Sequence, residues 1–210
     1  MRVPACGWRV LTFVLVAAIL AGCTTTGSAP APADPPSARV AIRTDLPLEA
    51  LHRGGLYILM RHAADQGKDA SPVDVGNCAT QATLTAAARQ QLAVTAADLA
   101  KLQIPIGTVL ASPYCRTLET ARLLFGRAAI TMDALQKPAT PERTAALVAA
   151  LSTRATLGSN TVLVSHREVI AASLGIDPAL GEAFVVQPDG AGGFVVLARV
   201  SIDGWKSPGQ

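Results

Sequence analysis

The sequence has 210 residues, a formal net charge of +3 and an aromatic content of 4%. Its charged residues are dispersed, so the sequence lacks the basic patch or stripe with which a protein binds nucleic acid. Composition therefore gives no support to nucleic-acid binding, and the sequence contains no internal repeat.

The first 22 residues are typical of a secretory signal peptide. Arg2 and Arg9 are followed by an apolar run over residues 10–21, which is shorter than the about 20 residues of a comfortable transmembrane helix. The run ends in LAGC, which resembles the lipobox of bacterial lipoproteins, where cleavage precedes an acylated cysteine. We therefore expect a mature lipid-anchored protein that begins at Cys23. The alternative is an uncleaved signal anchor or a signal that is cut elsewhere.

Residues 23–48 are expected to form a disordered tether between the lipid and the folded part. The segment TTTGSAPAPADPPSA has too little apolar surface to fold, and its prolines favour an extended chain. Thr24 follows the cysteine where an aspartate would signal retention, and this resemblance to Gram-negative sorting rules favours the outer membrane. The predicted location is the periplasmic face of the cell envelope.

Residues 49–205 are expected to form one domain in which strands alternate with helices. Strands are predicted at 55–60, 108–111, 129–132, 161–164, 184–186 and 193–200, and helices at 84–102 (N-cap Thr85), 113–125, 141–151 and 168–174. Residues 63–82 lack periodicity and indicate a long loop. The alternation predicts a three-layer α/β/α sandwich around a mostly parallel sheet, with the last two strands as an antiparallel addition.

Two cysteines remain once Cys6 is assigned to the signal peptide and Cys23 to the lipid. Because an exported protein reaches an oxidising compartment, we expect a disulfide between Cys78 and Cys115. Two buried free thiols are the alternative. In the chain-entropy model such a bond stabilises the fold by on the order of 3–4 kcal/mol.

Polar residues follow three of the predicted strands. Arg61 and His62 follow the first strand, Arg116 lies beyond the second, and His166 follows the strongly apolar fourth. Since α/β sheets bind ligands at the carboxyl ends of their strands, these side chains are expected to meet. Two guanidinium groups suit the oxygens of a transferring phosphoryl group, a neutral histidine can attack phosphorus, and a second, protonated histidine can stabilise the oxygens. The remaining histidine, His52, is interpreted as a surface residue.

The segments around these positions resemble those of the histidine phosphatase superfamily, also called the phosphoglycerate-mutase-like family. LMRHA at 59–63 is similar to the family's RHG motif, ASPYCRTLETA at 111–121 to its SPxxRxxxTA segment, and VLVSH at 162–166 to the strand before its second histidine. The order is the family's, and the resemblance covers roughly residues 54–200. Taken singly, each arginine could be a surface cation and each histidine an ordinary loop residue. Their occurrence together, in the family's order along the chain, favours a single active site.

The resemblance implies a phosphoglycerate-mutase-like fold and a phosphomonoesterase that needs no metal or organic cofactor. His62 would be the nucleophile that forms a phosphohistidine. Arg61 and Arg116 would bind the phosphate, and His166 would stabilise the transition state before water hydrolyses the intermediate. The chain would be a small exported lipoprotein member of this superfamily.

The general acid that would protonate the leaving group is not marked by a motif. Glu182 is preferred because it lies just before a predicted strand, and Glu168, close to the second histidine, is the alternative. Asp133 and Glu142 are further candidates, and some small family members manage without a dedicated acid.

Two residues depart from the family's pattern. Ala63 stands where glycine is usual, and Arg167 stands where a small residue is common; for Arg167 we favour a solvent-facing position over one in the pocket. A phosphomonoesterase is favoured over a catalytically silent phosphate-binding lipoprotein, and a phosphomutase is disfavoured in an exported protein. The expected substrate is a phosphorylated small molecule or envelope glycan, and the oligomeric state has no sequence signal.

Overall fold

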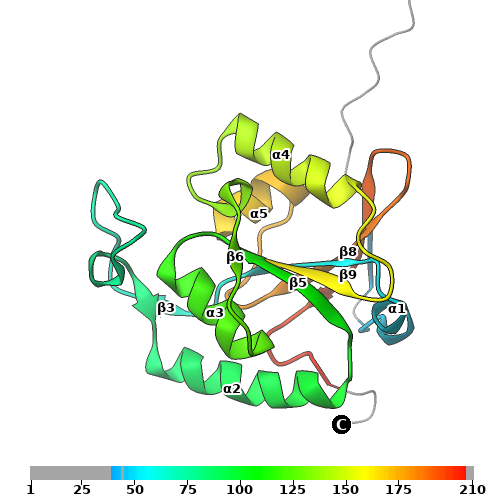
Figure 1. The fold of residues 1–210 in the computed structure, drawn as a ribbon, viewed down its shortest axis with the longest axis horizontal. Helices are drawn as coiled ribbons and strands as arrows, with labels where there is room; N and C mark the ends of the chain where they lie inside the picture. Colours follow the sequence, from blue (N-terminus) through cyan, green and yellow to red (C-terminus); the bar gives the residue numbers. More distant parts are fainter. Residues whose placement is uncertain (1–38, 44, 207–210) are drawn as a thin grey trace, which may run out of the picture. The chain divides into compact units, whose positions relative to one another are not determined.

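A computed structural model of the protein describes residues 39–43 and 45–206. The predicted signal peptide, the lipidation site Cys23 and the tether as far as residue 38 lie outside the described residues. The described part contains a seven-stranded sheet with helices on both faces, and a separate two-stranded ribbon (Figure 1). Within this part of the chain, no helix is both long and apolar enough to cross a membrane.

The seven-stranded sheet is mixed and mostly parallel, with the order β1-β9-β8-β2-β7-β5-β6. Its strands are β1 (Arg39–Arg43), β2 (Tyr57–Arg61), β5 (Ile106–Ala111), β6 (Ile130–Thr131), β7 (Asn160–Ser165), β8 (Ala183–Pro188) and β9 (Phe194–Val200). The strands β2, β7, β5 and β6 run parallel, whereas β8 runs antiparallel to both β2 and β9. The predicted parallel sheet with an antiparallel addition is therefore confirmed.

Helices pack on both faces of this sheet. They are α1 (Leu48–Arg53), α2 (Ala86–Lys101), α3 (Cys115–Phe125), α4 (Pro141–Ser152) and α5 (Arg167–Leu174), with short 3-10 helices η1 (Cys78–Thr80) and η2 (Asp133–Leu135). The predicted cap of α2 is confirmed, because the Thr85 hydroxyl accepts a hydrogen bond from the Ala88 N–H at 3.0 Å.

Two apolar cores lie on opposite faces of the sheet, because successive side chains of a strand point to opposite sides. Along β2, Ile58 and Met60 join the core that contains residues of α2 and α3, whereas Tyr57 and Leu59 join the core that contains residues of α4 and α5. Strands that are buried on both faces are apolar throughout, which is why short apolar runs located the central strands in the sequence. The three-layer arrangement is thus confirmed.

The N-terminal boundary differs from the prediction. Residues 39–43 form β1, which pairs in parallel with β9, so the expected tether over residues 23–48 is wrong for this strand, whereas α1 begins at Leu48, within one residue of the predicted domain boundary. The Pro/Ala-rich composition that suggested a tether ends at residue 38. Beyond it, an extended segment can satisfy the unpaired backbone groups along the edge of β9.

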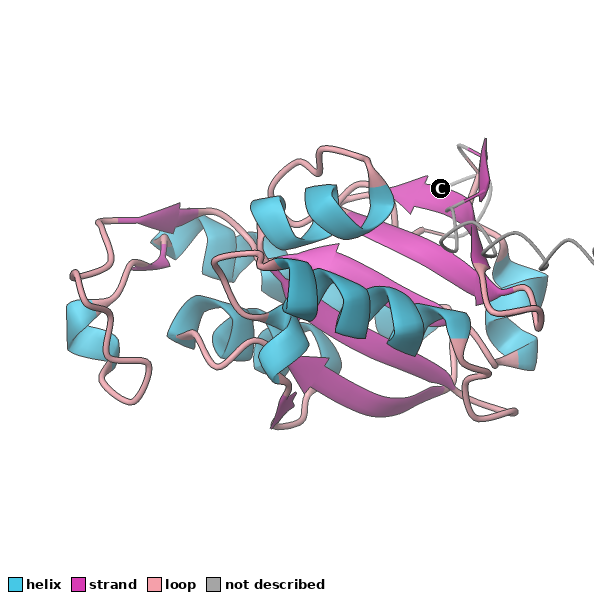
Figure 2. Ribbon diagram, turned by 90° about the horizontal axis from the view of Figure 1, so that it is seen from above, coloured by secondary structure: helices cyan, strands magenta, loops and turns pink. Residues whose placement is uncertain are grey.

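The segment predicted as a long loop, residues 63–82, is more structured than its composition suggested. It contains β3 (Asp65–Gln66), which pairs with β4 (Thr83–Leu84), and it also contains η1. Figure 2 shows this segment extending beyond one end of the seven-stranded sheet. Cys78 in η1 forms the predicted disulfide with Cys115, so the segment is fastened to the first residue of α3.

Candidate active site

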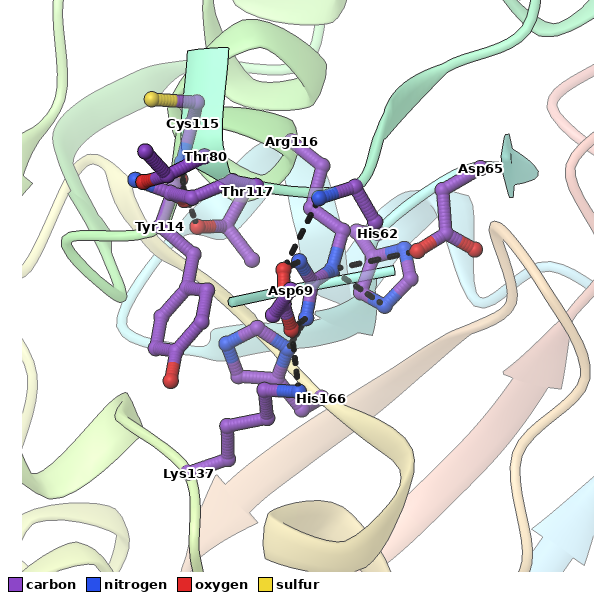
Figure 3. A network of polar contacts seen from close by, with 12 residues as sticks. His62, Asp65, Asp69, Thr80, Tyr114, Cys115, Arg116, Thr117, Lys137 and His166 are labelled. Atoms are coloured by element: carbon purple, nitrogen blue, oxygen red, sulfur yellow. Dashed lines mark hydrogen bonds and ion pairs between the residues drawn. The ribbon is translucent and has the colours of Figure 1, made fainter. Parts of the chain in front are cut away.

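The carboxyl ends of β2, β5 and β7 bring the sequence-predicted residues together. Arg61 ends β2 and His62 follows it, His166 is the N-cap of α5 directly after β7, and Arg116 lies in the first turn of α3. The imidazole rings of His62 and His166 lie 5.4 Å apart between centroids, next to the Arg116 guanidinium (Figure 3). The exposed fractions of His62, Arg116 and His166 are only 5%, 3% and 1%, so their charges and protons are shielded from water.

His62 is held in one tautomer by the backbone. Its Nδ1 lies 2.8 Å from the carbonyl oxygen of Ala63, and because a carbonyl only accepts, Nδ1 carries the proton. The lone pair is therefore on Nε2, toward which Arg116 Nε donates over 3.4 Å. Burial lowers the pKa of His62 to about 4, and the cations of Arg116 and Arg61 act in the same direction. At neutral pH, His62 thus presents an unprotonated Nε2 beside a guanidinium group.

His166 is also neutral in this arrangement. Burial lowers its pKa to about 2, and the charges of His62 and Arg116 add to this effect. The expectation from the sequence that this second histidine is protonated is therefore corrected: its ring is neutral. Its Nε2 lies 2.8 Å from the Ser112 hydroxyl, and Nδ1 lies 3.5 Å from Arg116 Nη2. When Ser112 donates to Nε2, the ring proton is on Nδ1 and can be donated to an oxyanion beside Arg116.

Arg61 contributes a second guanidinium group. Its Nη1 donates to the carbonyl of Pro178 at 2.9 Å, while its Nε is buried and has no hydrogen-bond partner among the described residues. A buried N–H without an acceptor is unfavourable, so this donor is available to an anion. Burial lowers the pKa of Arg61 from its ordinary value, and the carboxylate of Asp65 partly counteracts that shift.

Arg116 contacts two carboxylates that sequence reasoning missed. Asp69 accepts hydrogen bonds from Nη1 and Nη2 at 2.8 and 3.2 Å, and Asp65 Oδ2 lies 3.3 Å from Nε. Lys137 Nζ lies 2.5 Å from Asp69 Oδ2. Burial raises the pKa of Asp69, but hydrogen bonds from Arg116 and Lys137 outweigh it and hold that pKa well below its usual range. A buried arginine predicts a counter-charge, but the sequence does not identify which loop carboxylate supplies it.

The preferred general acid, Glu182, is directed elsewhere. Its carboxylate accepts hydrogen bonds from Arg199 Nε and Nη2 at 2.5 and 2.7 Å and from the Ala179 N–H at 2.8 Å. This assignment is corrected, because the Arg199 guanidinium and the Ala179 N–H engage both carboxylate oxygens of Glu182. Of the alternatives, Glu168 and Glu142 are exposed in the first turns of α5 and α4, and Asp133 is exposed and paired with Arg143.

The structure shows the surroundings of Ala63 and Arg167, the two residues that depart from the family's pattern. Ala63 is fully buried, and its N–H donates to the Thr120 hydroxyl at 3.2 Å. Arg167 is exposed and pairs with Asp177 at 2.6 Å, in keeping with its predicted solvent-facing position. The remaining histidine, His52, is exposed on α1, as expected. Within residues 39–43 and 45–206, no group of three or more His, Cys, Asp or Glu side chains is arranged to hold a metal ion.

Comparisons with known proteins identify the fold. No family model matches the sequence, and no curated protein matches it. The solved structure of the protein histidine phosphatase SixA with tungstate has a TM-score of 0.55 and 18% identity, covering 70% of this chain and 97% of that one.

Two further solved structures show the same likeness. A protein from Agrobacterium tumefaciens, provisionally named a phosphohistidine phosphatase SixA, has a TM-score of 0.50 and 17% identity over 70% of this chain and 97% of its own. A protein from Escherichia coli K-12, provisionally named an alpha-ribazole-5′-phosphate phosphatase, has a TM-score of 0.51 and 16% identity over 68% and 95%. The described part of the chain therefore has the fold of the histidine phosphatases, as predicted.

Proposed function

We propose that the protein is a phosphomonoesterase that acts through a phosphohistidine on His62. The observation that carries the proposal is the state of His62 Nε2, which is buried, unprotonated and 3.4 Å from the Arg116 Nε–H. A nucleophile beside fixed donors is the arrangement that phosphoryl transfer requires. The fold likeness to a histidine phosphatase that binds tungstate, a tetrahedral oxyanion like phosphate, supports the proposal.

In the proposed reaction, Nε2 of His62 attacks phosphorus and the bond from phosphorus to the ester oxygen breaks. Arg116 and Arg61 donate hydrogen bonds to the equatorial oxygens, where the guanidinium groups offset the negative charge. The neutral His166 ring donates through Nδ1 to the same group. Water then attacks the phosphohistidine, which releases inorganic phosphate and restores the lone pair on Nε2.

Asp65 replaces Glu182 as the candidate for protonating the leaving oxygen. Its Oδ2 lies 3.3 Å from the same Arg116 Nε atom that faces His62 Nε2, and its side chain is 26% exposed, so water and a bound substrate can reach it. We expect Asp65→Asn to lower kcat about 10²-fold for an alkyl phosphate and much less for p-nitrophenyl phosphate, whose leaving group needs no proton. The comparison of the two substrates for both proteins checks this prediction.

Glu168→Gln is the matched control for Asp65→Asn, because it removes the exposed carboxylate that the sequence offered as the alternative acid. We expect this variant to keep its rate with both substrates. An alkyl-phosphate defect in Glu168→Gln but not in Asp65→Asn would transfer the acid function to Glu168.

The pH dependence of kcat/KM follows from the lowered pKa of His62. Protonation of Nε2 removes the nucleophile, so activity is lost as the pH falls through the pKa of the free enzyme. We expect an acid limb near pH 4 instead of near 6.5, the ordinary value for histidine. Stopped assays across pH 3.5–8 with an aryl phosphate, corrected for the substrate's own ionisation, measure this limb. An acid limb at 6.5 would contradict a buried, neutral His62.

The substrate class and location are part of the proposal. The signal-like residues 1–22 and Cys23 support export, lipid anchoring and a substrate among phosphorylated small molecules or envelope glycans. Metabolic labelling with palmitate, with Cys23→Ser as the unlabelled control, tests the anchor. A phosphoester screen on the purified protein tests the chemistry, and tungstate binding without any turnover would favour the catalytically silent alternative.

A further inference from the structure

The Arg116 guanidinium group presents two edges to different partners. Its end edge, formed by Nη1 and Nη2, donates to both carboxylate oxygens of Asp69 at 2.8 and 3.2 Å. Its side edge, formed by Nε and Nη2, lies 3.4 Å from His62 Nε2 and 3.5 Å from His166 Nδ1. Asp65 Oδ2 also lies on this side edge, 3.3 Å from Nε. Because arginine has five N–H donors, the bonds to Asp69 still leave the Nε–H and one Nη2–H directed to the side where a group on His62 would lie, next to Asp65.

Asp69 is itself fixed from several sides. Besides the two bonds from Arg116, its Oδ1 accepts the Ala82 N–H at 2.9 Å, and its Oδ2 lies 2.5 Å from Lys137 Nζ. Lys137 in turn lies over the Tyr114 ring, 5.1 Å from its centroid (Figure 3). The Asp69 side chain is 14% exposed, so the ion pair with Arg116 is shielded from water and its geometry is well defined.

The chain segment that carries Asp69 is fastened to the helix that carries Arg116. Cys78 is bonded to Cys115, the residue directly before Arg116. The buried Gln81 side chain accepts the Cys115 N–H at 3.0 Å and donates to the Asp74 carbonyl at 2.9 Å, so it ties the same segment to the same point of α3. The carboxylate and the guanidinium are therefore held by one local framework.

We propose that Asp69 is a positioning residue for phosphoryl transfer: it holds the end edge of Arg116 so that the side edge stays aimed at the phosphoryl group on His62. The proposal rests on the proposed function. Donors oriented before the substrate arrives need no reorganisation during the reaction, and this preorganisation is where their stabilisation of the transition state originates. A long, flexible arginine side chain is not oriented by its own rotamers, so a fixed carboxylate supplies the orientation.

A competing interpretation is that Asp69 blocks the phosphate site and must leave before substrate binds. The two-edge geometry opposes it, because a phosphoryl group on His62 Nε2 meets the side edge of Arg116, whereas Asp69 occupies the end edge. The two interpretations also predict opposite changes in oxyanion affinity when Asp69 is replaced. Removing a positioning residue weakens oxyanion binding and slows turnover, whereas removing a blocking residue strengthens binding.

The test is Asp69→Asn in the full chain, with Asp74→Asn as the matched control. Both variants remove one negative charge from the same segment, but Asp74 is exposed and its side chain caps only the Gly76 N–H. We expect Asp69→Asn to lower kcat for p-nitrophenyl phosphate about 10²-fold and to raise KM by a smaller factor. Its tungstate affinity, measured by calorimetry, should fall about tenfold, as expected when a charge-assisted hydrogen bond is weakened. Asp69→Glu should recover part of the loss, and Asp74→Asn should match the wild type.

Faster turnover or tighter tungstate binding in Asp69→Asn would overturn the proposal, as would equality with Asp74→Asn. If Asp69→Asn does not fold, wild-type protein with the Cys78–Cys115 bond reduced tests the same framework. We expect its kcat to fall while its thermal unfolding stays cooperative, and an unchanged kcat in reduced, folded protein would also overturn the proposal. Absence of turnover in the wild type would defeat the proposed function alone, because tungstate binding still compares Asp69→Asn with Asp74→Asn.

Discussion

Replacement of His62 by alanine is expected to abolish phosphatase activity, with a loss in kcat on the order of 10⁵-fold or more. The reason is that Nε2 of His62 is the nitrogen that bonds to phosphorus in the proposed reaction, and Arg116 donates toward it from 3.4 Å. The remaining donors still bind an oxyanion, so tungstate affinity should fall far less than the rate. Steady-state assays with p-nitrophenyl phosphate, paired with calorimetric titration of tungstate, measure the two effects separately.

His52→Ala is the matched control, because it removes an exposed imidazole on α1. It should keep the wild-type rate. The intermediate offers a direct readout: radiolabelled substrate quenched in alkali should leave label on the wild type and none on His62→Ala. Label retained by His62→Ala, or a rate equal to that of His52→Ala, would remove His62 from the nucleophile position.

The central elements of the fold could be predicted because their burial produces recognisable apolar patterns in the sequence. β2 and β7 pack on both faces, so each is a short apolar run, and Thr85 marks the start of α2 with its side chain. β1 carries no such pattern. It is a short edge strand whose existence depends on the unpaired edge of β9, which lies far away in the sequence.

The candidate site could be predicted where a strand end determines the position or, for Arg116 in α3, where a recognised motif does. Arg61 ends β2, and His62 and His166 directly follow β2 and β7, so the parallel sheet brings them to one edge. Asp69 lies in an aperiodic segment, and its pairing with Arg116 spans 47 positions of the sequence, which no local pattern reports. Glu182 was assigned wrongly for the same reason.

Glu182 shows how a cross-strand partner changes the role of a carboxylate. It lies directly before β8, close in the chain to the site, and this proximity suggested a general acid. Its actual partner, Arg199, is on the neighbouring strand β9, and their short bidentate ion pair engages both oxygens of the carboxylate. Sequence distance from a site therefore does not give side-chain direction at the edge of a mixed sheet.

Arg116→Lys is expected to lower kcat/KM about 10³-fold, although it preserves the positive charge. Truncation to alanine would remove both hydrogen bonds that Arg116 donates to Asp69 and leave that carboxylate to Lys137 and the Ala82 N–H, so lysine is the less disruptive substitution. Lysine can still pair with Asp69, but it lacks the planar fork that serves Asp69 on one edge and the phosphoryl group on the other. Steady-state kinetics and tungstate titration measure the loss, and a wild-type kcat/KM would exclude Arg116 from phosphate binding.

Arg122→Lys is the control for this substitution, because Arg122 is exposed on the same helix, and it should leave kcat/KM unchanged. The combination of Arg116→Lys with Asp69→Asn then decides how the two residues are related. If Asp69 acts only by orienting the guanidinium group of Arg116, replacing Asp69 in the Arg116→Lys protein should lower kcat/KM little further. The effects of the two substitutions on kcat/KM should then be strongly non-additive. Full additivity would mean that Asp69 contributes to turnover independently of Arg116.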